Sequence, residues 1–361
     1  MNAPHSKPTV FIEAAVVEIS WRDETRNLSE LIFDSVRRAI DESGRGMMGI
    51  TSVVLAAHDL VDGRSLSSMV TAPAAGAYLR DEIRYGDDGA AAFAAAVVRI
   101  EAGEADRSIV AAWGRASEHD VDGVSRALFD PFFGAPLGLE ELHVSGLRAQ
   151  SWIQAGGRCD ARAHAVSRRR DAARNNPRAL RDGGRSSRPS YPLSPDDLPV
   201  WADVVAAAII TSQPARVKVS GMGQSSEPFA IGDRQLAAMP GLVRAGELAL
   251  REANIAAGDL DVVEVDGLSL FDEALALEAL GIARKGDGLT AFASDRRINC
   301  SGGSAAGYCA PAMGLARIVE ATLQLQGRAG AIQLPSARRA LATGSSIVAA
   351  QTHTAVVLEG V

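Results

Sequence analysis

A chain of 361 residues can bury a large core and suggests two domains, or one domain with an internal duplication. Hydrophobic residues make up 47% and charged residues 22%, which is typical of a globular protein, and the formal charge of −7 argues against a general nucleic-acid binder. No apolar run approaches the roughly 18 residues of a membrane span and residues 1–10 lack a signal-peptide pattern, so we expect a cytoplasmic protein.

The first part of the chain alternates strand-like and helix-like segments. Runs rich in β-branched residues predict strands, and apolar residues at helical spacing predict helices. In chain order we expect a strand over 10–17, a helix over 28–40, a strand over 52–57, an alanine-rich helix over 90–103 and a strand over 108–113. This pattern defines an N-terminal half, residues 1–117.

An insertion with a different composition follows, over residues 118–198. Between Arg158 and Arg188 it carries ten arginines and three aspartates, and residues 182–190 are loop-like. The arginines form either a solvated helix with a flexible loop or a surface that binds phosphates, because a guanidinium group suits bidentate phosphate contacts.

The last part, residues 199–361, repeats the order of the first. We expect a strand over 217–219, a helix over 242–256, a strand over 261–265, a helix over 314–327 and a strand over 329–334. Two similar βαβαβ-type halves predict an α/β protein in which helices cover the sheets, a duplicated fold layered α-β-α-β-α.

Cysteine and histidine are sparse. Cys159, Cys300 and Cys309 are too few for a disulfide framework, and neither they nor the six histidines have the spacing of a metal site. We therefore expect no bound metal.

A glycine-rich turn is the most informative segment. Residues 299–304 read Asn-Cys-Ser-Gly-Gly-Ser and lead into a long amphipathic helix. Glycines let backbone N–H groups approach a ligand, and a helix N-terminus favours negative charge. Gly302, Gly303 and Ser304 are therefore candidates for holding a thioester oxygen or another developing oxyanion.

Several blocks in this order resemble the thiolase superfamily, nearest its sterol-carrier-protein-type (lipid-transfer-protein) branch. They are Glu-Ala-Gly-Glu-Ala-Asp at 101–106, Asp-Val-Val-Glu-Val-Asp at 261–266 with the helix-like 271–281, the glycine-rich 299–314, and Arg-Asn-Asn-Pro at 174–177. The resemblance implies the duplicated thiolase fold with an inserted loop domain and a CoA thioester as ligand, with no permanently bound cofactor.

The resemblance also shows that the usual chemical groups are replaced. Where the family has its nucleophilic cysteine this chain has Gly86, where it has an oxyanion-hole histidine it has Asp266, and where it has the basic histidine it has Tyr308. No cysteine occurs between Met1 and Arg158, so an acyl-cysteine intermediate at the family's position is excluded.

Two polar residues are left as candidate catalytic groups. Tyr308 would act as a general acid or base if its surroundings lowered the phenol pKa, and otherwise is a buried tyrosine with a satisfied hydroxyl. Asp266 would accept a proton from a hydroxyl group, or would simply cap a turn. The resemblance adds Arg168, Arg169 and Arg170 as candidates for binding the phosphates of CoA.

Three functional hypotheses remain open. The favoured one is a degenerate thiolase-like subunit without catalysis, which binds acyl-CoA and stabilises an active partner. The second is a cysteine-independent retro-aldolase that cleaves a β-hydroxyacyl-CoA with Tyr308, and the third is a lipid- or acyl-binding protein. The resemblance implies a homodimer, or a hetero-oligomer with a thiolase paralogue or a zinc-ribbon/OB-fold protein.

Overall fold

The computed structural model describes residues 7–361 and is built around one nine-stranded sheet. The strand order is β3-β2-β4-β5-β1-β6-β9-β8-β7. The strands are β1 (Phe11–Ser20), β2 (Ser52–Ala56), β3 (Asp81–Tyr85), β4 (Arg107–Arg115), β5 (Asp203–Thr211), β6 (Val217–Ser226), β7 (Val262–Glu264), β8 (Arg339–Ser345) and β9 (Thr352–Gly360). Only a short pairing of Phe11 and Ile12 with Lys218 and Val217 joins the two parts of this sheet.

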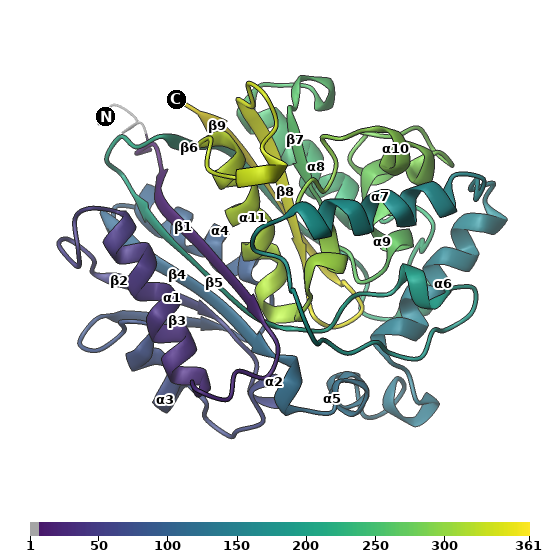
Figure 1. Cartoon of the computed structure of the whole chain (residues 1–361), viewed down its shortest axis with the longest axis horizontal. Helices are drawn as coiled ribbons and strands as arrows, with labels where there is room; N and C mark the ends of the chain where they lie inside the picture. The colour runs from purple at the N-terminus through teal and green to yellow at the C-terminus, as the bar shows by residue number, and fades with distance from the viewer. Residues whose placement is uncertain (1–6) are drawn as a thin grey trace, which may run out of the picture.

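Helices form three layers around the two parts of the sheet (Figure 1). Helices α1 and α3 cover the outer face of the first part, α4 and α11 lie between the two parts, and α8 covers the outer face of β6 and β9. The helices are α1 (Leu28–Glu42), α2 (Asp59–Asp62), α3 (Ser68–Ala74), α4 (Gly89–Glu101), α5 (Val121–Leu128), α6 (Glu141–Gln154), α7 (Arg162–Asn175), α8 (Pro240–Ala253), α9 (Leu270–Ala279), α10 (Gly288–Ser294) and α11 (Ala310–Leu325).

Local sequence explains why these layers pack closely. Helix α4 begins at an Asp88 N-cap whose side chain accepts a hydrogen bond from Ala90 N, and its alanine-rich surface fits between two sheets. Strand β6 carries Gly221 and Gly223 where α8 crosses it. A Cβ atom at either glycine would lie within 2.2 Å of a backbone oxygen of α8, so larger residues would push the helix away.

The expected α/β architecture with two similar halves is confirmed, and most expected elements lie within a few residues of the observed ones. The strand expected over 329–334 is wrong: this segment contains a short 3₁₀-helix, Gly330–Ile332. Its backbone and side chains bond to the end of α11, since Leu334 N donates to Gln324 Oε1 and Gln333 Nε2 donates to Gln324 O. The missed strand β8 follows instead.

Strand β5 was also missed. It pairs antiparallel with both β1 and β4, so it completes the first part of the sheet after the insertion. The expected boundaries at residues 117 and 198 stay predictions, and the pairing of β5 favours a C-terminal half that begins after Thr211.

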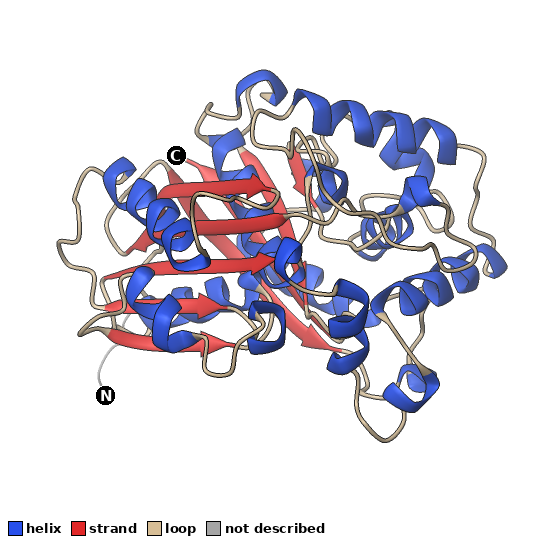
Figure 2. Ribbon diagram, turned by 60° about the horizontal axis from the view of Figure 1, so that its bottom comes forward, coloured by secondary structure: helices blue, strands red, loops and turns tan. Residues whose placement is uncertain are grey.

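The insertion lies at one end of the sheet, as Figure 2 shows. Helix α6 packs on α9 and helix α7 on α10, both in the second part, whereas α5 lies against α2 of the first part. Within residues 7–361, no helix combines the length and the apolar character that a bilayer crossing demands.

Candidate functional site

A narrow cavity of about 50 Å³ lies where the insertion meets the C-terminal half of the fold. Its lining brings together Asp266 after β7, Tyr308 before α11, Ser345 at the end of β8, and Glu141 and Arg148 of α6. Tyr308 and Asp266, the two candidate catalytic residues, therefore face the same space although 42 residues separate them in the chain.

Tyr308 is held in place by its backbone and its ring. Tyr308 N donates to Val200 O and Tyr308 O accepts from Ala202 N, so the end of the insertion pairs with this residue. Its ring packs edge-on against Trp201, with centroids 5.3 Å apart. No side-chain hydrogen bond within residues 7–361 involves its hydroxyl, and Tyr308 lines the cavity, so the hydroxyl can bind a ligand atom there.

Burial raises the pKa of the Tyr308 phenol well above its usual range, and the nearby carboxylate of Asp266 raises it further. The surroundings therefore do not lower this pKa, because they are buried and acidic rather than cationic. A phenol that stays protonated is a hydrogen-bond donor or general acid and a poor base.

Asp266 has the opposite character, that of a carboxyl group poised to exchange a proton near neutral pH. Burial raises its pKa from 3.8 to about 7, an effect that Arg317 opposes and Glu273 reinforces. Its Oδ2 accepts a hydrogen bond from Ser345 N at 3.2 Å. A carboxyl group with a pKa near 7 can serve as a general base or acid at neutral pH.

Asp88 is a second buried carboxyl group next to Asp266. Burial raises its pKa well above the usual range, and the charges of Asp266 and Asp87 add to this effect. Its oxygens accept hydrogen bonds from Ala90 N and Gly314 N, both at 2.8 Å, and so join the first turns of α4 and α11. Asp88 therefore has a clear structural role.

The structure adds cavity residues that the sequence did not single out. Burial raises the pKa of Glu141 to about 7, so a second carboxyl group titrates near neutrality in the same cavity. Ser345 Oγ shares a 3.1 Å hydrogen bond with Nδ1 of the buried His353. Glu141 follows Glu140 at a helix start, where acidic residues are common, so nothing in the local sequence marks it.

The position of the missing nucleophile lies on an exposed loop. Gly86 follows β3, and a Cβ atom placed there would have the ring of His58 as its nearest neighbour, at 3.8 Å. The adjacent Asp87 accepts a hydrogen bond from Ile347 N at 2.9 Å, which places this loop beside the cavity wall.

No cysteine of the described chain lines the cavity. Cys300 is buried and donates to Glu264 Oε1 at 3.2 Å, and burial with that carboxylate raises its thiol pKa well above the usual range. Cys309 packs against Gly114, and burial raises its thiol pKa as well. Both side chains suit small buried hydrophobic groups and would be poor thiolate nucleophiles.

The glycine-rich turn binds the protein's own groups. Ser304 N donates to Glu273 Oε1 at 2.9 Å, so a buried carboxylate occupies the donor that we expected a ligand to use. Gly302 lies against Ala173 of α7 and Gly303 against Glu273, with no space for a Cβ atom at either. The ligand-binding role of Gly302, Gly303 and Ser304 stays a prediction. In this conformation the turn packs between α7 and the buried Glu273.

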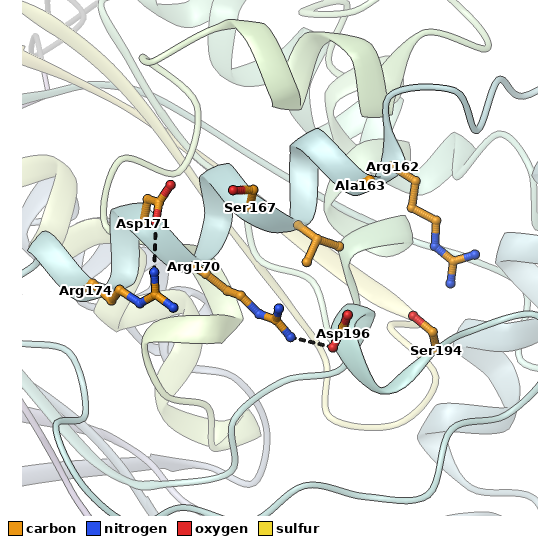
Figure 3. A pocket seen from close by; sticks show the side chains of 9 residues that line it. Arg162, Ala163, Ser167, Arg170, Asp171, Arg174, Ser194 and Asp196 are labelled. Atoms are coloured by element: carbon orange, nitrogen blue, oxygen red, sulfur yellow. Dashed lines mark hydrogen bonds and ion pairs between the residues drawn. The ribbon is translucent and has the colours of Figure 1, made fainter.

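The three arginines at 168–170 face different ways. Arg168 donates to Ile298 O and stacks on the ring of Phe292, whereas Arg169 is buried and pairs with Glu273 at 3.2 Å. Only Arg170 faces an open surface pocket of about 420 Å³ (Figure 3). Arg162 and Arg174 line the same pocket, in which Arg170 pairs with Asp196 and Arg174 with Asp171.

The thiolase C-terminal domain-like family matches residues 223–359, the part that carries Asp266, Tyr308 and Ser345. The fold matches solved thiolases over nearly the whole chain: human mitochondrial 3-ketoacyl-CoA thiolase aligns with a TM-score of 0.72 at 14% identity, covering 98% of this chain and 99% of that one. The chain has a thiolase-like fold. The same enzyme in complex with CoA aligns with the same TM-score.

Other similar proteins differ in activity. The Ltp2-ChsH2(DUF35) aldolase aligns with a TM-score of 0.79 at 17% identity, covering 98% of both chains. Acetyl-CoA acetyltransferase of Methanothermobacter thermautotrophicus is 33% identical over 190 residues, 46% of this chain and 49% of that protein. Human sterol carrier protein 2 is 29% identical over 161 residues, 39% of this chain and 29% of that protein. The matched part is thus about half of the acetyltransferase and less than a third of the sterol carrier protein.

Proposed function

We propose that this thiolase-like protein is a cysteine-independent carbon–carbon lyase that acts on a β-hydroxyacyl-CoA. One observation carries the proposal: a protonated phenol, Tyr308, and a carboxyl group with a pKa of about 7, Asp266, line one cavity in which no thiol is present among the described residues. A retro-aldol cleavage needs one group to accept a proton and another to stabilise an enolate, and it needs no nucleophile.

In the proposed reaction the Asp266 carboxylate takes the proton of the β-hydroxyl group. The Cα–Cβ bond breaks, the β-carbon leaves as an aldehyde or ketone, and the electron pair forms the enolate of the thioester. The Tyr308 hydroxyl donates a hydrogen bond to the thioester oxygen, where the negative charge develops, and the nearby Arg148 adds a positive charge. Protonated Asp266 then returns its proton to Cα, so the shortened acyl-CoA leaves and the enzyme is restored.

The similarity in fold to an aldolase supports this proposal over the non-catalytic role that the sequence favoured. The test is release of an aldehyde or ketone from a β-hydroxyacyl-CoA, measured together with the acyl-CoA product. We expect Tyr308→Phe to lower kcat at least a hundredfold, because it removes a donor to the developing enolate. If the lyase rate is unchanged in Tyr308→Phe, the Tyr308 hydroxyl does not stabilise the enolate.

For the CoA part of the substrate we propose the pocket that Arg162, Arg170 and Arg174 line. The arginines suit phosphate oxygens, which would replace the carboxylates of Asp196 and Asp171 as their partners. Replacing Arg170 and Arg174 by methionine should weaken CoA binding at least tenfold in a calorimetric titration. Arg37→Met on the exposed face of α1 serves as the matched control and should change nothing.

A non-catalytic, acyl-CoA-binding subunit is the second candidate, and the size of the cavity favours it. A volume of about 50 Å³ has room for one or two water molecules, so any substrate requires the cavity to widen. Exposed Met69, Tyr78 and Leu79 beside the edge strand β3 offer an apolar surface for a second copy, a thiolase paralogue or a zinc-ribbon/OB-fold protein. This role would be supported if the protein binds acyl-CoA without turning it over and if a thiolase that co-purifies with it is more active in its presence.

A further inference from the structure

A serine, a histidine and a glutamate lie side by side at one end of the second part of the sheet. Ser345 is the last residue of β8, and its register partner on β9 is His353. His353 is in turn the partner of Ser225 on β6, and Glu227 follows Ser225 by two residues. Because side chains two residues apart along a strand point to the same face, the topology brings the three side chains together.

The three side chains form a row that starts in the candidate catalytic cavity. Ser345 Oγ shares its 3.1 Å hydrogen bond with His353 Nδ1, and His353 Nε2 lies 3.9 Å from Glu227 Oε1. His353 and Glu227 are buried, whereas Ser345 is half-buried and lines the cavity. An alcohol in a cavity, a base in contact with it and a carboxylate beyond the base are the three groups of a serine hydrolase.

Glu227 uses one carboxylate oxygen for the fold. Its Oε1 accepts a 2.6 Å hydrogen bond from Gly241 N in the first turn of α8, where a negative charge is favourable. Its Oε2 is buried and has no hydrogen-bond partner within residues 7–361. A buried carboxylate oxygen without a donor is costly, so a role in capping α8 leaves this oxygen unexplained. A positive charge on the adjacent His353 would stabilise it.

The surroundings of His353 set its charge. Burial lowers the pKa of the imidazole to about 3, and the charges of Arg148 and Arg234 contribute to this shift. The ring is therefore neutral at physiological pH, and a neutral ring with its proton on Nε2 accepts a proton at Nδ1. The two arginines oppose a positive charge on the ring, whereas Glu227 attracts it. His353 is thus a weak base, and we expect any reaction that it assists to be slow.

We propose that Ser345 is a nucleophile and that the protein also hydrolyses acyl-CoA thioesters. Ser345 Oγ attacks the thioester carbon while His353 Nδ1 takes the hydroxyl proton, and the Tyr308 hydroxyl, in the same cavity, donates to the developing oxyanion. The C–S bond breaks, CoA leaves as a thiol with the proton from His353, and the acyl group stays on Ser345 as an ester. Water then loses a proton to His353 and attacks this ester, and the carboxylic acid leaves as Ser345 regains its proton.

This activity shares the CoA thioester with the proposed function but requires no β-hydroxyl group. The test therefore uses butyryl-CoA, which cannot undergo retro-aldol cleavage, and measures the free thiol that the full chain releases. We expect release above the spontaneous rate and a loss of at least a hundredfold in Ser345→Ala. Ser226→Ala is the matched control, because this serine is exposed at the end of β6 and bonds to Thr352 Oγ1. It should keep the wild-type rate.

Glu227→Gln separates the proposed role of Glu227 from its role in the fold. Glutamine keeps an oxygen for Gly241 N and removes the charge that attracts a proton to His353, so thiol release should fall at least tenfold. A second measurement does not depend on how the variants fold. A fluorophosphonate should label Ser345 in the wild-type protein, as peptide mass spectrometry can show, and should label it more slowly in Glu227→Gln.

The outcomes separate this inference from the lyase proposal. No thiol release from butyryl-CoA, or an unchanged rate in Ser345→Ala, would overturn the role of Ser345. Aldehyde or ketone release from a β-hydroxyacyl-CoA in the same preparation would then leave the lyase proposal intact. Hydrolysis of butyryl-CoA that Ser345→Ala abolishes, without any aldehyde or ketone from a β-hydroxyacyl-CoA, would support the hydrolase and refute the lyase.

Discussion

Replacing Asp266 by asparagine should stabilise the protein at alkaline pH and inactivate it. Asp266 is buried, and its carboxyl group accepts hydrogen bonds from the backbone of Ser345 and of Gly267, beside a second buried carboxyl group at Asp88. Asparagine has nearly the same shape, keeps an oxygen to accept a hydrogen bond, and carries no charge. The substitution therefore removes the cost of a buried charge with little change in packing.

The magnitude follows from the pKa of the carboxyl group. Burial raises it from 3.8 to about 7, so the folded protein holds the proton more tightly than the unfolded chain does. Below pH 4 the carboxyl group is protonated in both the folded and the unfolded protein, and its contribution to the free energy of unfolding is fully present. This contribution is lost as the pH rises to 7, because the unfolded chain releases the proton first. Since one pKa unit corresponds to about 1.4 kcal/mol, the wild type loses about 4 kcal/mol across this range through Asp266, and Asp266→Asn does not.

Urea unfolding of both proteins between pH 5 and pH 9 measures this difference. The stability of Asp266→Asn relative to the wild type should increase by about 1.4 kcal/mol per pH unit up to pH 7 and then level off. Asp182→Asn, at an exposed position in a loop, is the control for loss of a carboxylate. Its free energy of unfolding should change with pH in the same way as that of the wild type. A difference between Asp266→Asn and the wild type that is independent of pH would refute the argument that this carboxyl group is protonated by burial.

Three further predictions concern the surroundings of the cavity. Glu264→Gln should lower the free energy of unfolding by about 3–5 kcal/mol in urea titrations, because it breaks a buried ion pair and leaves its arginine partner unpaired. Gly344→Ala should lower the melting temperature through a loss of about 1–3 kcal/mol, because its Cβ atom would lie 2.1 Å from the Asp88 carboxylate; an unchanged melting temperature would contradict the packing. Iodoacetamide at pH 8 should modify Cys159 in the native protein before the two buried cysteines, which peptide mass spectrometry can follow.

The architecture could be predicted from the sequence because its elements are long and periodic. Helix α1 has a clear apolar stripe, and β2 and β4 are continuous apolar runs of the kind found in buried parallel strands. Strand β5 is just as apolar, but it was missed, and its pairing with β1 and β4 spans the arginine-rich insertion. Which strand pairs with which depends on long-range contacts that a local pattern does not contain.

The site could be predicted only in part, for a physical reason. The resemblance located Tyr308 and Asp266, and both line the cavity. The direction of the pKa shift of Tyr308 depends on burial and on carboxylates that come from three other segments, so no local pattern contains it. Similarly, the sequence shows three adjacent arginines, but a helix sends adjacent residues to different faces, and only Arg170 of the three lines the surface pocket.

The cost of burying carboxyl groups in the cavity favours the proposed lyase over the non-catalytic alternative. Asp266 and Glu141 each have a pKa near 7 through burial, so both destabilise the fold when they ionise at physiological pH. Asp88 joins two helix starts through its hydrogen bonds, whereas Asp266 accepts from the backbone of Ser345, at 3.2 Å, and of the adjacent Gly267. A site without chemistry would gain stability from an apolar or amide side chain at position 266, since buried charges are costly and most proteins are only marginally stable. A carboxyl group that costs stability and faces a cavity beside a tyrosine hydroxyl is therefore better explained by a role in proton transfer. If Asp266→Asn is more stable than the wild type and has lost lyase activity, then the wild type retains this carboxyl group for activity at the expense of stability.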